Sequence, residues 1–311
     1  QPIDVAVVGG GMVGAAAALG LAQQGFTVAV IEHAEPPAYD PAAPVDVRIS
    51  AISSASVGLL RSLGVWDAIQ AMRCHPYSRL ETWEWESAQV VFDAADLKLP
   101  ELGYMVENNV LQRALWEQMV AHPRITLRCP TTLSALHRHA DSSTLECADG
   151  ETLTARLVVG ADGANSQVRR WAGIGVHAWQ YQQSCMLISV KCENAPGRST
   201  WQHFTPNGPH AFLPLFDSWA SLVWYDRPAR IRQLQGISMA QLKREINVHF
   251  PARLGEVTPV AAGAFPLTRR HAVDYAQPGL VLVGDAAHTI HPLAGQGVNL
   301  GYRDVDALID V

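Results

Sequence analysis

Short apolar runs separated by a helical segment open the chain. Ile3–Val8 is mostly apolar, a glycine-rich turn follows it, and an alanine-rich segment leads to a second apolar run, Val28–Ile31. Apolar runs of this length bounded by glycines are typical of buried strands, and the segment between them is long enough for a helix. The pattern predicts a strand–helix–strand unit in a parallel sheet.

The pattern changes twice further along the chain. Residues 79–86 alternate weakly and are expected to form a hairpin with residues 90–92, outside the parallel sheet. Between residues 177 and 265, short strands rich in aromatic residues dominate, and one helix is expected at residues 239–250. This texture predicts an antiparallel sheet covered by a helix. Residues 260–266 and 280–283 are expected to return the chain to the parallel sheet.

These segments predict two interleaved domains. A discontinuous nucleotide-binding domain takes residues 1–75, 103–176 and 266–311, and an inserted second domain takes residues 76–102 and 177–265. The apolar positions after residue 297 recur at helical spacing up to Val311, without a cap or a basic last turn. We therefore expect further C-terminal helices that this chain does not contain.

Composition narrows the functional classes. Of the 311 residues, 48% are hydrophobic, which suits a globular enzyme, and the formal net charge is −6. Because no basic cluster is long enough for a nucleic-acid footprint, nucleic acid is not an expected partner. Five scattered cysteines without a C-x-x-C pair indicate reduced thiols in a cytoplasmic protein. No apolar run reaches the roughly 18 residues of a transmembrane helix, and no signal peptide is visible.

The turn after the first strand carries a specific motif. It has the spacing G-x-G-x-x-G between strand and helix, and an acidic residue ends the second strand 18 residues later. In this context the glycines let the backbone approach a pyrophosphate at the helix N-terminus, and the carboxylate binds the adenosine ribose. The motif predicts a dinucleotide site built on Gly9, Gly11, Gly14 and Glu32.

A second motif occupies residues 284–299, where a buried strand leads through a Pro/Gly loop into a helix start. An aspartate at the end of this strand can accept a hydrogen bond from a sugar hydroxyl. Glycines let the backbone approach a flat ligand, and the helix start offers unpaired N–H groups and the positive end of its dipole. The expected ligand contacts are Asp285, Pro292, Gly295, Gly297, Val298 and Asn299.

Two histidines in the same segment, His288 and His291, raise the alternative of a metal site. Proline and glycines make the segment a loop and no third ligand is in view, so no metal is expected. No side chain stands out as a general base, and catalytic residues stay unassigned. The hydrolase motif G-x-S-x-G is absent.

A third segment, residues 157–169, is an apolar strand followed by Ala-Asp-Gly-Ala-Asn-Ser-Gln-Val-Arg. The three segments together resemble the flavoprotein aromatic hydroxylases, and residues 284–301 resemble the ubiquinone-biosynthesis branch of that family. Residues 75–97 carry a finer likeness to members that act on a benzoquinol of the demethoxy-ubiquinol type. The resemblance covers essentially the whole chain. It implies an α/β fold in which a Rossmann-like FAD-binding domain holds an inserted antiparallel-sheet substrate domain.

The resemblance also implies the chemistry. FAD is the expected cofactor, with Arg48, Gln112 and Asp162 as further contacts. NAD(P)H is the expected transient reductant, and it has no second G-x-G-x-x-G domain here. In the family, O₂ and reduced FAD form a C4a-hydroperoxide, which here would hydroxylate the ring of a polyprenylated quinol. Because such a substrate is as apolar as a lipid, peripheral contact with the inner membrane and with other ubiquinone-biosynthesis proteins is expected.

Two alternatives remain open at this point. The chain could catalyse another ring hydroxylation of the same pathway, or serve as a non-catalytic flavin-bound subunit of a biosynthetic complex. Trp83 and Trp85 echo the Trp-x-Trp motif of flavin halogenases, but no Ile-Pro follows and the motif lies elsewhere in the chain.

Overall fold

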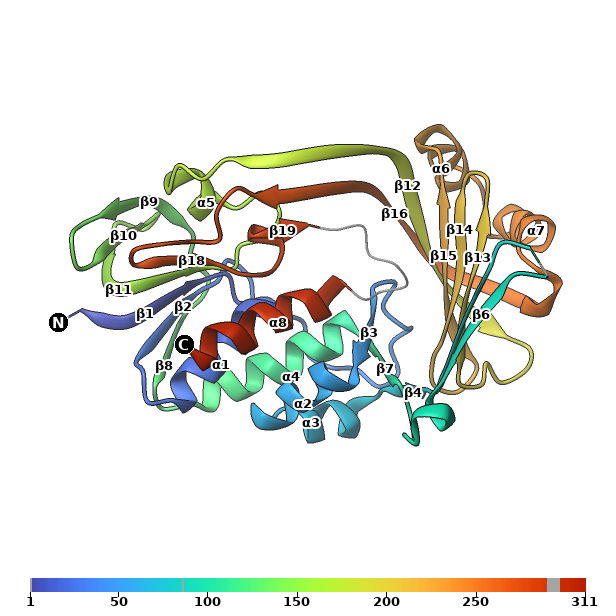
Figure 1. Cartoon of the computed structure of the whole chain (residues 1–311), viewed down its shortest axis with the longest axis horizontal. Coiled ribbons are helices and arrows are strands. Elements are labelled where there is room, and N and C mark those ends of the chain that lie inside the picture. The colour runs from blue at the N-terminus through green and yellow to red at the C-terminus, as the bar shows by residue number, and fades with distance from the viewer. Residues whose placement is uncertain (1, 86, 290–296) are drawn as a thin grey trace.

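The computed structural model describes residues 2–85, 87–289 and 297–311, apart from the side chains of residues 180 and 181. Two sheets dominate the fold: a mainly parallel sheet with helices against it, and a mainly antiparallel sheet. The long strands β12 (Val176–Cys192) and β16 (Val257–Ala272) run from one sheet region to the other (Figure 1). This arrangement agrees with the expected α/β fold class.

The first sheet has the order β17-β18-β11-β1-β2-β8, in which β18, β11, β1, β2 and β8 are parallel. A hairpin of β9 and β10 extends it from β11. The predicted strands of residues 3–8 and 28–31 are its centre. Its strands are β1 (Ile3–Val8), β2 (Val28–Ile31), β8 (Ile125–Arg128), β9 (Leu133–Arg138), β10 (Ser143–Cys147), β11 (Thr152–Gly160), β17 (Ala276–Gln277) and β18 (Leu280–Leu282).

Helix α1 (Met12–Gln23) is the inner helix of the layer against this sheet, and nine of its twelve residues are buried. Its alanines and glycines allow close packing. A Cβ added at Gly20 would lie 2.1 Å from the end of the Ile309 side chain, so a larger residue here would force that side chain of α8 to move. The other helices are α2 (Ser54–Ser62), α3 (Trp66–Met72), α4 (Asn108–Ala121) and α8 (Gly297–Asp310), with α5 (Gln167–Trp171) near the β9–β10 hairpin.

The second sheet has the order β19-β16-β12-β15-β14-β13-β5-β6 and is apolar on both faces. Alternate residues such as Met186 and Ile188 pack under two helices, while Cys185 and Leu213 belong to a core on the opposite face. Its remaining elements are β5 (Arg79–Trp83), β6 (Gln89–Asp93), β13 (Ser199–Thr205), β14 (Gly208–Pro214), β15 (Trp219–Asp226), β19 (His288–Thr289), α6 (Pro228–Gln235) and α7 (Met239–His249).

A small third sheet with the order β3-β7-β4 lies beside the helix layer. It consists of β3 (Ile49–Ser53), β7 (Gly103–Glu107) and β4 (His75–Tyr77). Three 3-10 turns complete the elements of the described residues: η1 (Ala94–Leu97), η2 (Ala252–Leu254) and η3 (Gly284–Ala286).

Two expectations about the second sheet were wrong. Two helices cover it instead of the one expected. Helix α6, which comes before α7 in the chain, also buries Ile231 and Leu234 against this sheet. Residues 260–266 do not rejoin the parallel sheet. They lie inside β16, which pairs with β12 along most of its length. Since both strands cross the expected domain boundaries, the division at residues 176/177 and 265/266 stays a prediction.

No helix in the described parts of the chain is long and apolar enough to cross a membrane.

Candidate functional site

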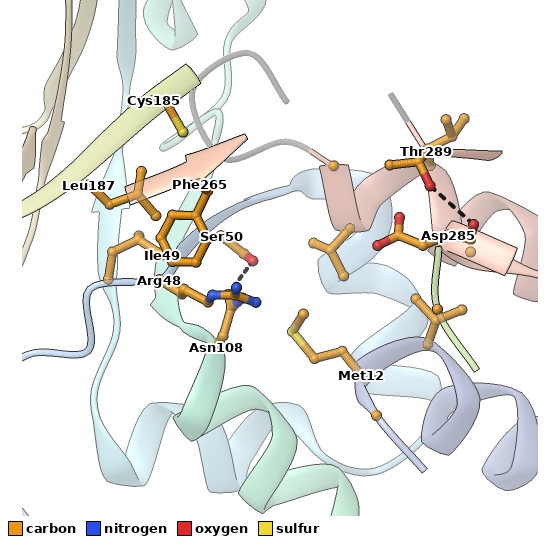
Figure 2. A pocket seen from close by; sticks show the side chains of 18 of the residues that line it. Met12, Arg48, Ile49, Ser50, Asn108, Cys185, Leu187, Phe265, Asp285 and Thr289 are labelled. Atoms are coloured by element: carbon orange, nitrogen blue, oxygen red, sulfur yellow. Dashed lines mark hydrogen bonds between the residues drawn. The ribbon is translucent and has the colours of Figure 1, made fainter. Parts of the chain in front are cut away.

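A cavity of about 560 Å³ lies between the loops that follow the parallel strands and one face of the second sheet, a size typical of small-molecule and cofactor sites. Residues from both ends of the chain and from the second sheet line it (Figure 2). Six of the predicted contacts line the cavity, namely Gly11, Arg48, Gln112, Asp285, Gly297 and Val298.

The glycines of the first motif shape one end of this cavity. A Cβ on Gly9, whose φ is +104°, would lie 2.2 Å from the Ala161 carbonyl oxygen, and one on Gly14 would lie 1.8 Å from the Gly9 carbonyl oxygen. Gly11 differs, since a Cβ there meets nothing within 4 Å. Gly11 is also the N-cap of α1, whose first turn has no acidic residue and no side-chain cap. The helix start therefore offers free N–H groups to an anion.

Glu32 stands beside the glycine loop, as the fingerprint predicts. Its Oε1 accepts a hydrogen bond from the Gly10 N–H at 3.0 Å, and its Oε2 accepts one from Ala34 N–H at 3.1 Å. The backbone thus holds the carboxylate next to the loop that approaches the ligand. This placement fits a ribose hydroxyl at the adenosine end of a dinucleotide.

Arg48 reaches the cavity from the segment before β3. Its guanidinium lies 4.4 Å from the centre of the Phe265 ring, which comes from β16 of the second sheet (Figure 2). Gln112 and Asn108 lie four residues apart on α4 and both line the cavity. The Asn108 amide oxygen accepts a hydrogen bond from the Ser50 hydroxyl at 2.6 Å. This side of the cavity therefore combines one cation with side-chain amides.

Asp285 lies across the cavity from Arg48 (Figure 2). The residue is exposed to the open cavity on one side, while protein atoms surround its carboxyl group on the other sides. This burial raises the pKa of the Asp285 carboxyl, while the nearby His288 and Arg48 oppose the rise. A carboxylate with few water contacts is stabilised by a hydrogen bond from a hydroxyl group, such as one of a ribose.

His288 links three cavity-lining segments through a hydrogen bond to Asp304. It is buried, and its Nε2 lies 2.6 Å from Oδ2 of Asp304 on α8, while the same oxygen accepts the Gly284 N–H at 2.8 Å. Because a carboxylate oxygen only accepts, His288 carries a proton on Nε2. The pair joins η3, β19 and α8. His291 lies outside the described residues, and within those residues no cluster of three His, Cys, Asp or Glu side chains is suited to a metal ion.

Asn299 fastens the start of α8 to β3 and α2. Its Oδ1 accepts hydrogen bonds from the Ser53 N–H at 3.1 Å and the Ser56 hydroxyl at 2.7 Å, and its Nδ2 donates to the Ala51 carbonyl at 2.8 Å. The side chain is thus committed to protein contacts. A ligand contact at this residue would come from its backbone.

Asp162 is turned towards α5. Its carboxylate accepts hydrogen bonds from the N–H groups of Gln167 and Val168, at 2.9 and 3.2 Å, and from the Ser166 hydroxyl. Its neighbour Gly163 lines the cavity instead. A direct contact from Asp162 to a ligand therefore stays a prediction. Pro292 and Gly295 lie outside the described residues.

The wall supplied by the second sheet was not predicted residue by residue. Its members alternate along the strands, so they share one face, but the sequence does not say which face borders the cavity. One member is a thiol: burial raises the pKa of Cys185 to about 11, so it stays protonated. The wall consists of Cys185, Leu187, Leu213, Ser221, Val223, Tyr225, Phe265 and Leu267.

Another unpredicted residue is Arg169, which is 5% exposed. Its guanidinium donates to the carbonyls of Ala286 and Ala164, both at 2.9 Å. It therefore joins the start of α5 to the turn that carries Asp285. Burial lowers the pKa of this arginine. No spacing rule in the sequence points to such a long-range carbonyl contact.

Known proteins place these features in a family. The family model described as an FAD binding domain matches residues 2–310. The chain is 75% identical over 311 residues to the 3-demethoxyubiquinol 3-hydroxylase of Escherichia coli (strain K12), covering 100% of this chain and 80% of that protein. It is 38% identical over 308 residues to the ubiquinone hydroxylase UbiL of Rhodospirillum rubrum, covering 99% of this chain and 71% of that one.

A solved structure agrees with the fold. A mutant of P. aeruginosa PqsL superimposes with a TM-score of 0.84 at 23% sequence identity, covering 100% of this chain and 86% of the other. At this identity the match speaks for the fold alone.

Proposed function

The chain belongs to the family of FAD-binding-domain proteins and is an FAD-dependent monooxygenase, and from that premise we propose that it hydroxylates the ring of a polyprenylated benzoquinol of the demethoxy-ubiquinol type. One observation carries the choice of substrate: the 75% identity over all 311 residues to the E. coli enzyme of that name. The reaction serves ubiquinone biosynthesis.

The residues present suit FAD. The start of α1 at Gly11 offers N–H groups to the pyrophosphate, and Glu32 stands ready for the adenosine ribose. Asp285 and Arg48 border the middle of the cavity from opposite sides, and Gly297 brings the N-terminus of α8 to it. Bound FAD would supply the redox chemistry: with electrons from NAD(P)H it would activate O₂, one oxygen atom of which would enter the ring while the other would leave as water.

The protein's own part is to bind, orient and exclude water. The α8 start can stabilise negative charge on a flavin through its N–H groups and dipole. The apolar wall of Leu187, Val223 and Phe265 can hold an aromatic ring and keep water from the reacting atoms. NAD(P)H acts as the transient reductant. Approach of the prenylated substrate involves peripheral contact with the inner membrane and with other proteins of the pathway.

The test is quinone analysis in cells. E. coli cells that lack their own 3-demethoxyubiquinol 3-hydroxylase receive this chain, and their quinones are measured by mass spectrometry. The demethoxy intermediate should disappear and ubiquinone should return. A chain with Gly11→Leu, which places a side chain in the cavity, is the matched control and should restore nothing.

Two results would replace the proposal. If the demethoxy intermediate persists in these cells while the chain restores ubiquinone in cells that lack another ring hydroxylase of the pathway, the chain belongs to that other hydroxylation. A purified protein that holds FAD but shows no substrate-stimulated NAD(P)H oxidation would be a non-catalytic flavin-bound subunit.

A further inference from the structure

A buried ion pair lies behind the segment that delivers Arg48 to the cavity. Arg73, just after α3, donates from Nε and one terminal nitrogen to both carboxylate oxygens of Glu107, at 2.5 and 2.7 Å. The two side chains are 10% and 2% exposed. A carboxylate buried to this degree depends on its partner, because an unpaired buried charge is strongly destabilising. Arg73 in turn keeps its charge, since the bonds to Glu107 raise its pKa.

Glu107, held in place by Arg73, also binds the segment before β3. Its Oε1 accepts a hydrogen bond from the Asp46 N–H at 2.9 Å. The Asp46 carboxylate then uses both oxygens: Oδ1 accepts from the Arg48 N–H at 3.1 Å, and Oδ2 accepts from the Asn109 N–H at 3.2 Å. Each link is a charge-assisted hydrogen bond to backbone.

The backbone of Arg48 is consequently held from both sides. Its N–H is bound by Asp46, and its carbonyl accepts the Asn108 N–H at 3.0 Å. The side chain leaves this fixed backbone for the cavity and stacks on Phe265. Arg73 itself packs 4.6 Å from the ring centre of Phe216, between β14 and β15 of the second sheet.

We propose that Arg73, Glu107 and Asp46 are positioning residues that fix the place of Arg48 in the cavity and that they act on FAD affinity through Arg48. The inference rests on the proposed function, in which Arg48 contacts FAD. None of the three is among the residues that line the described part of the cavity. Their effect on the cofactor must therefore pass through a residue that does line it.

The test is a thermodynamic cycle on FAD affinity, measured by titrating the flavin-stripped full chain with FAD. Arg48→Ala should raise the Kd for FAD about tenfold, the value of one charge-assisted contact. Arg73→Met and Glu107→Gln should each raise it by a similar factor. In the Arg48→Ala background, either change should add less than about twofold, because the contact it positions is already gone.

A second variant guards against simple unfolding. In Asp46→Asn the amide has one oxygen for two N–H groups, so the segment is loosened while the ion pair stays intact. It should reproduce the pattern of Arg73→Met at near-normal thermal stability. Arg230→Met is the matched control: it breaks the partly buried ion pair with Glu245 under the second sheet, 2.6 Å long, and should lower Tm without changing the Kd for FAD.

The outcomes separate the two ideas. If Arg48→Ala leaves the Kd for FAD unchanged, the contact assumed in the proposed function is wrong. If Arg48→Ala weakens FAD binding and the second changes multiply that loss in full, the three residues act independently of Arg48 and the inference is overturned.

Discussion

The two walls of the cavity are built from different materials. On the side of the parallel sheet, glycines and helix starts bring backbone to the ligand, as at Gly11 and Gly297. On the side of the antiparallel sheet, alternate side chains such as Leu187 and Val223 form the surface. A backbone wall tolerates almost no change where a Cβ has no room, whereas a side-chain wall accepts exchanges that conserve volume. In the function proposed above, FAD lies against the wall that tolerates little change and the quinol lies against the wall that accepts exchanges.

The largest effect should come from Gly14, which packs against the glycine loop behind the backbone wall and does not itself line the described part of the cavity. Gly14→Ala places a Cβ 1.8 Å from the Gly9 carbonyl oxygen, a backbone atom that cannot step aside. We expect a loss of more than about 4 kcal/mol in the free energy of unfolding, seen as insoluble protein or a collapsed Tm. Gly11→Ala is the matched control, with open space at its Cβ. It should keep the Tm of the FAD-free protein and weaken FAD binding. Equal Tm values for both variants would contradict the comparison.

The next effect concerns the outer face of the antiparallel sheet. His210 on β14 is 5% exposed and stacks 4.5 Å from Phe250, and burial lowers its pKa to about 4. Between about pH 6.5 and 4, His210 binds a proton in the unfolded chain but stays neutral in the folded chain. Stability is therefore complete above pH 6.5 and falls as pH drops through this range, by on the order of 3 kcal/mol.

Urea unfolding across this pH range tests the histidine. The variant His210→Phe keeps an aromatic ring for the stack and removes the titrating group, so its stability should depend less on pH between 4 and 6.5. A variant with the same steepness as the parent would show that other groups carry the acid sensitivity. FAD affinity of the variant at pH 7.5 should be unchanged, because His210 lies on the face away from the cavity.

A smaller effect is expected from the charged residue in the backbone wall. Asp285→Ala should raise the Kd for FAD about tenfold by removing a hydrogen-bond acceptor for the ligand. Without FAD its Tm should be unchanged or slightly higher, because the burial that raises the pKa of this carboxyl shows that its ionised form is disfavoured there. FAD at about 100 times Kd stabilises by about 2.7 kcal/mol, and the variant should lose half of this at the same concentration. Full flavin occupancy at low FAD would rule out the contact.

The smallest effect should distinguish the side-chain wall. Leu187→Met conserves volume, so it should cost less than about 1.5 kcal/mol in stability and leave the Kd for FAD unchanged. The KM for a quinol substrate should shift about threefold, because Leu187 lines the cavity. Met186→Leu, on the opposite face of the same strand, is the control and should leave KM as it was. Equal shifts in both would mean that the wall has no part in substrate binding.

The same contrast explains what the sequence could predict. The bounds of Ile3–Val8 and Val28–Ile31 were predicted correctly, because each is an apolar run limited by turn residues. Gly11, Arg48, Gln112 and Asp285 do meet at one cavity. The glycines are recognisable because their spacing is demanded by backbone geometry, which leaves few substitutes.

Other features left no local signal. Helix α6 buries only Ile231 and Leu234, too few positions to show a helical period. The length of β16 depends on its pairing with β12, a partner distant in the chain. Both faces of the antiparallel sheet are apolar, so the hydrophobic pattern could not show which side chains border the cavity. Networks such as Arg73–Glu107–Asp46 depend on folding that brings separate segments together.

The hydrogen bond between the Ser53 N–H and Asn299 joins residues 246 positions apart, and this separation affects the order in which the fold can form. During synthesis the glycine loop and α1 leave the ribosome long before α8 exists. Contacts between such distant segments form late, since the intervening chain must first be made and its loop closed. The pocket therefore becomes complete only after nearly all of the described chain has emerged. FAD can therefore stabilise the chain only once α1 and α8 have met.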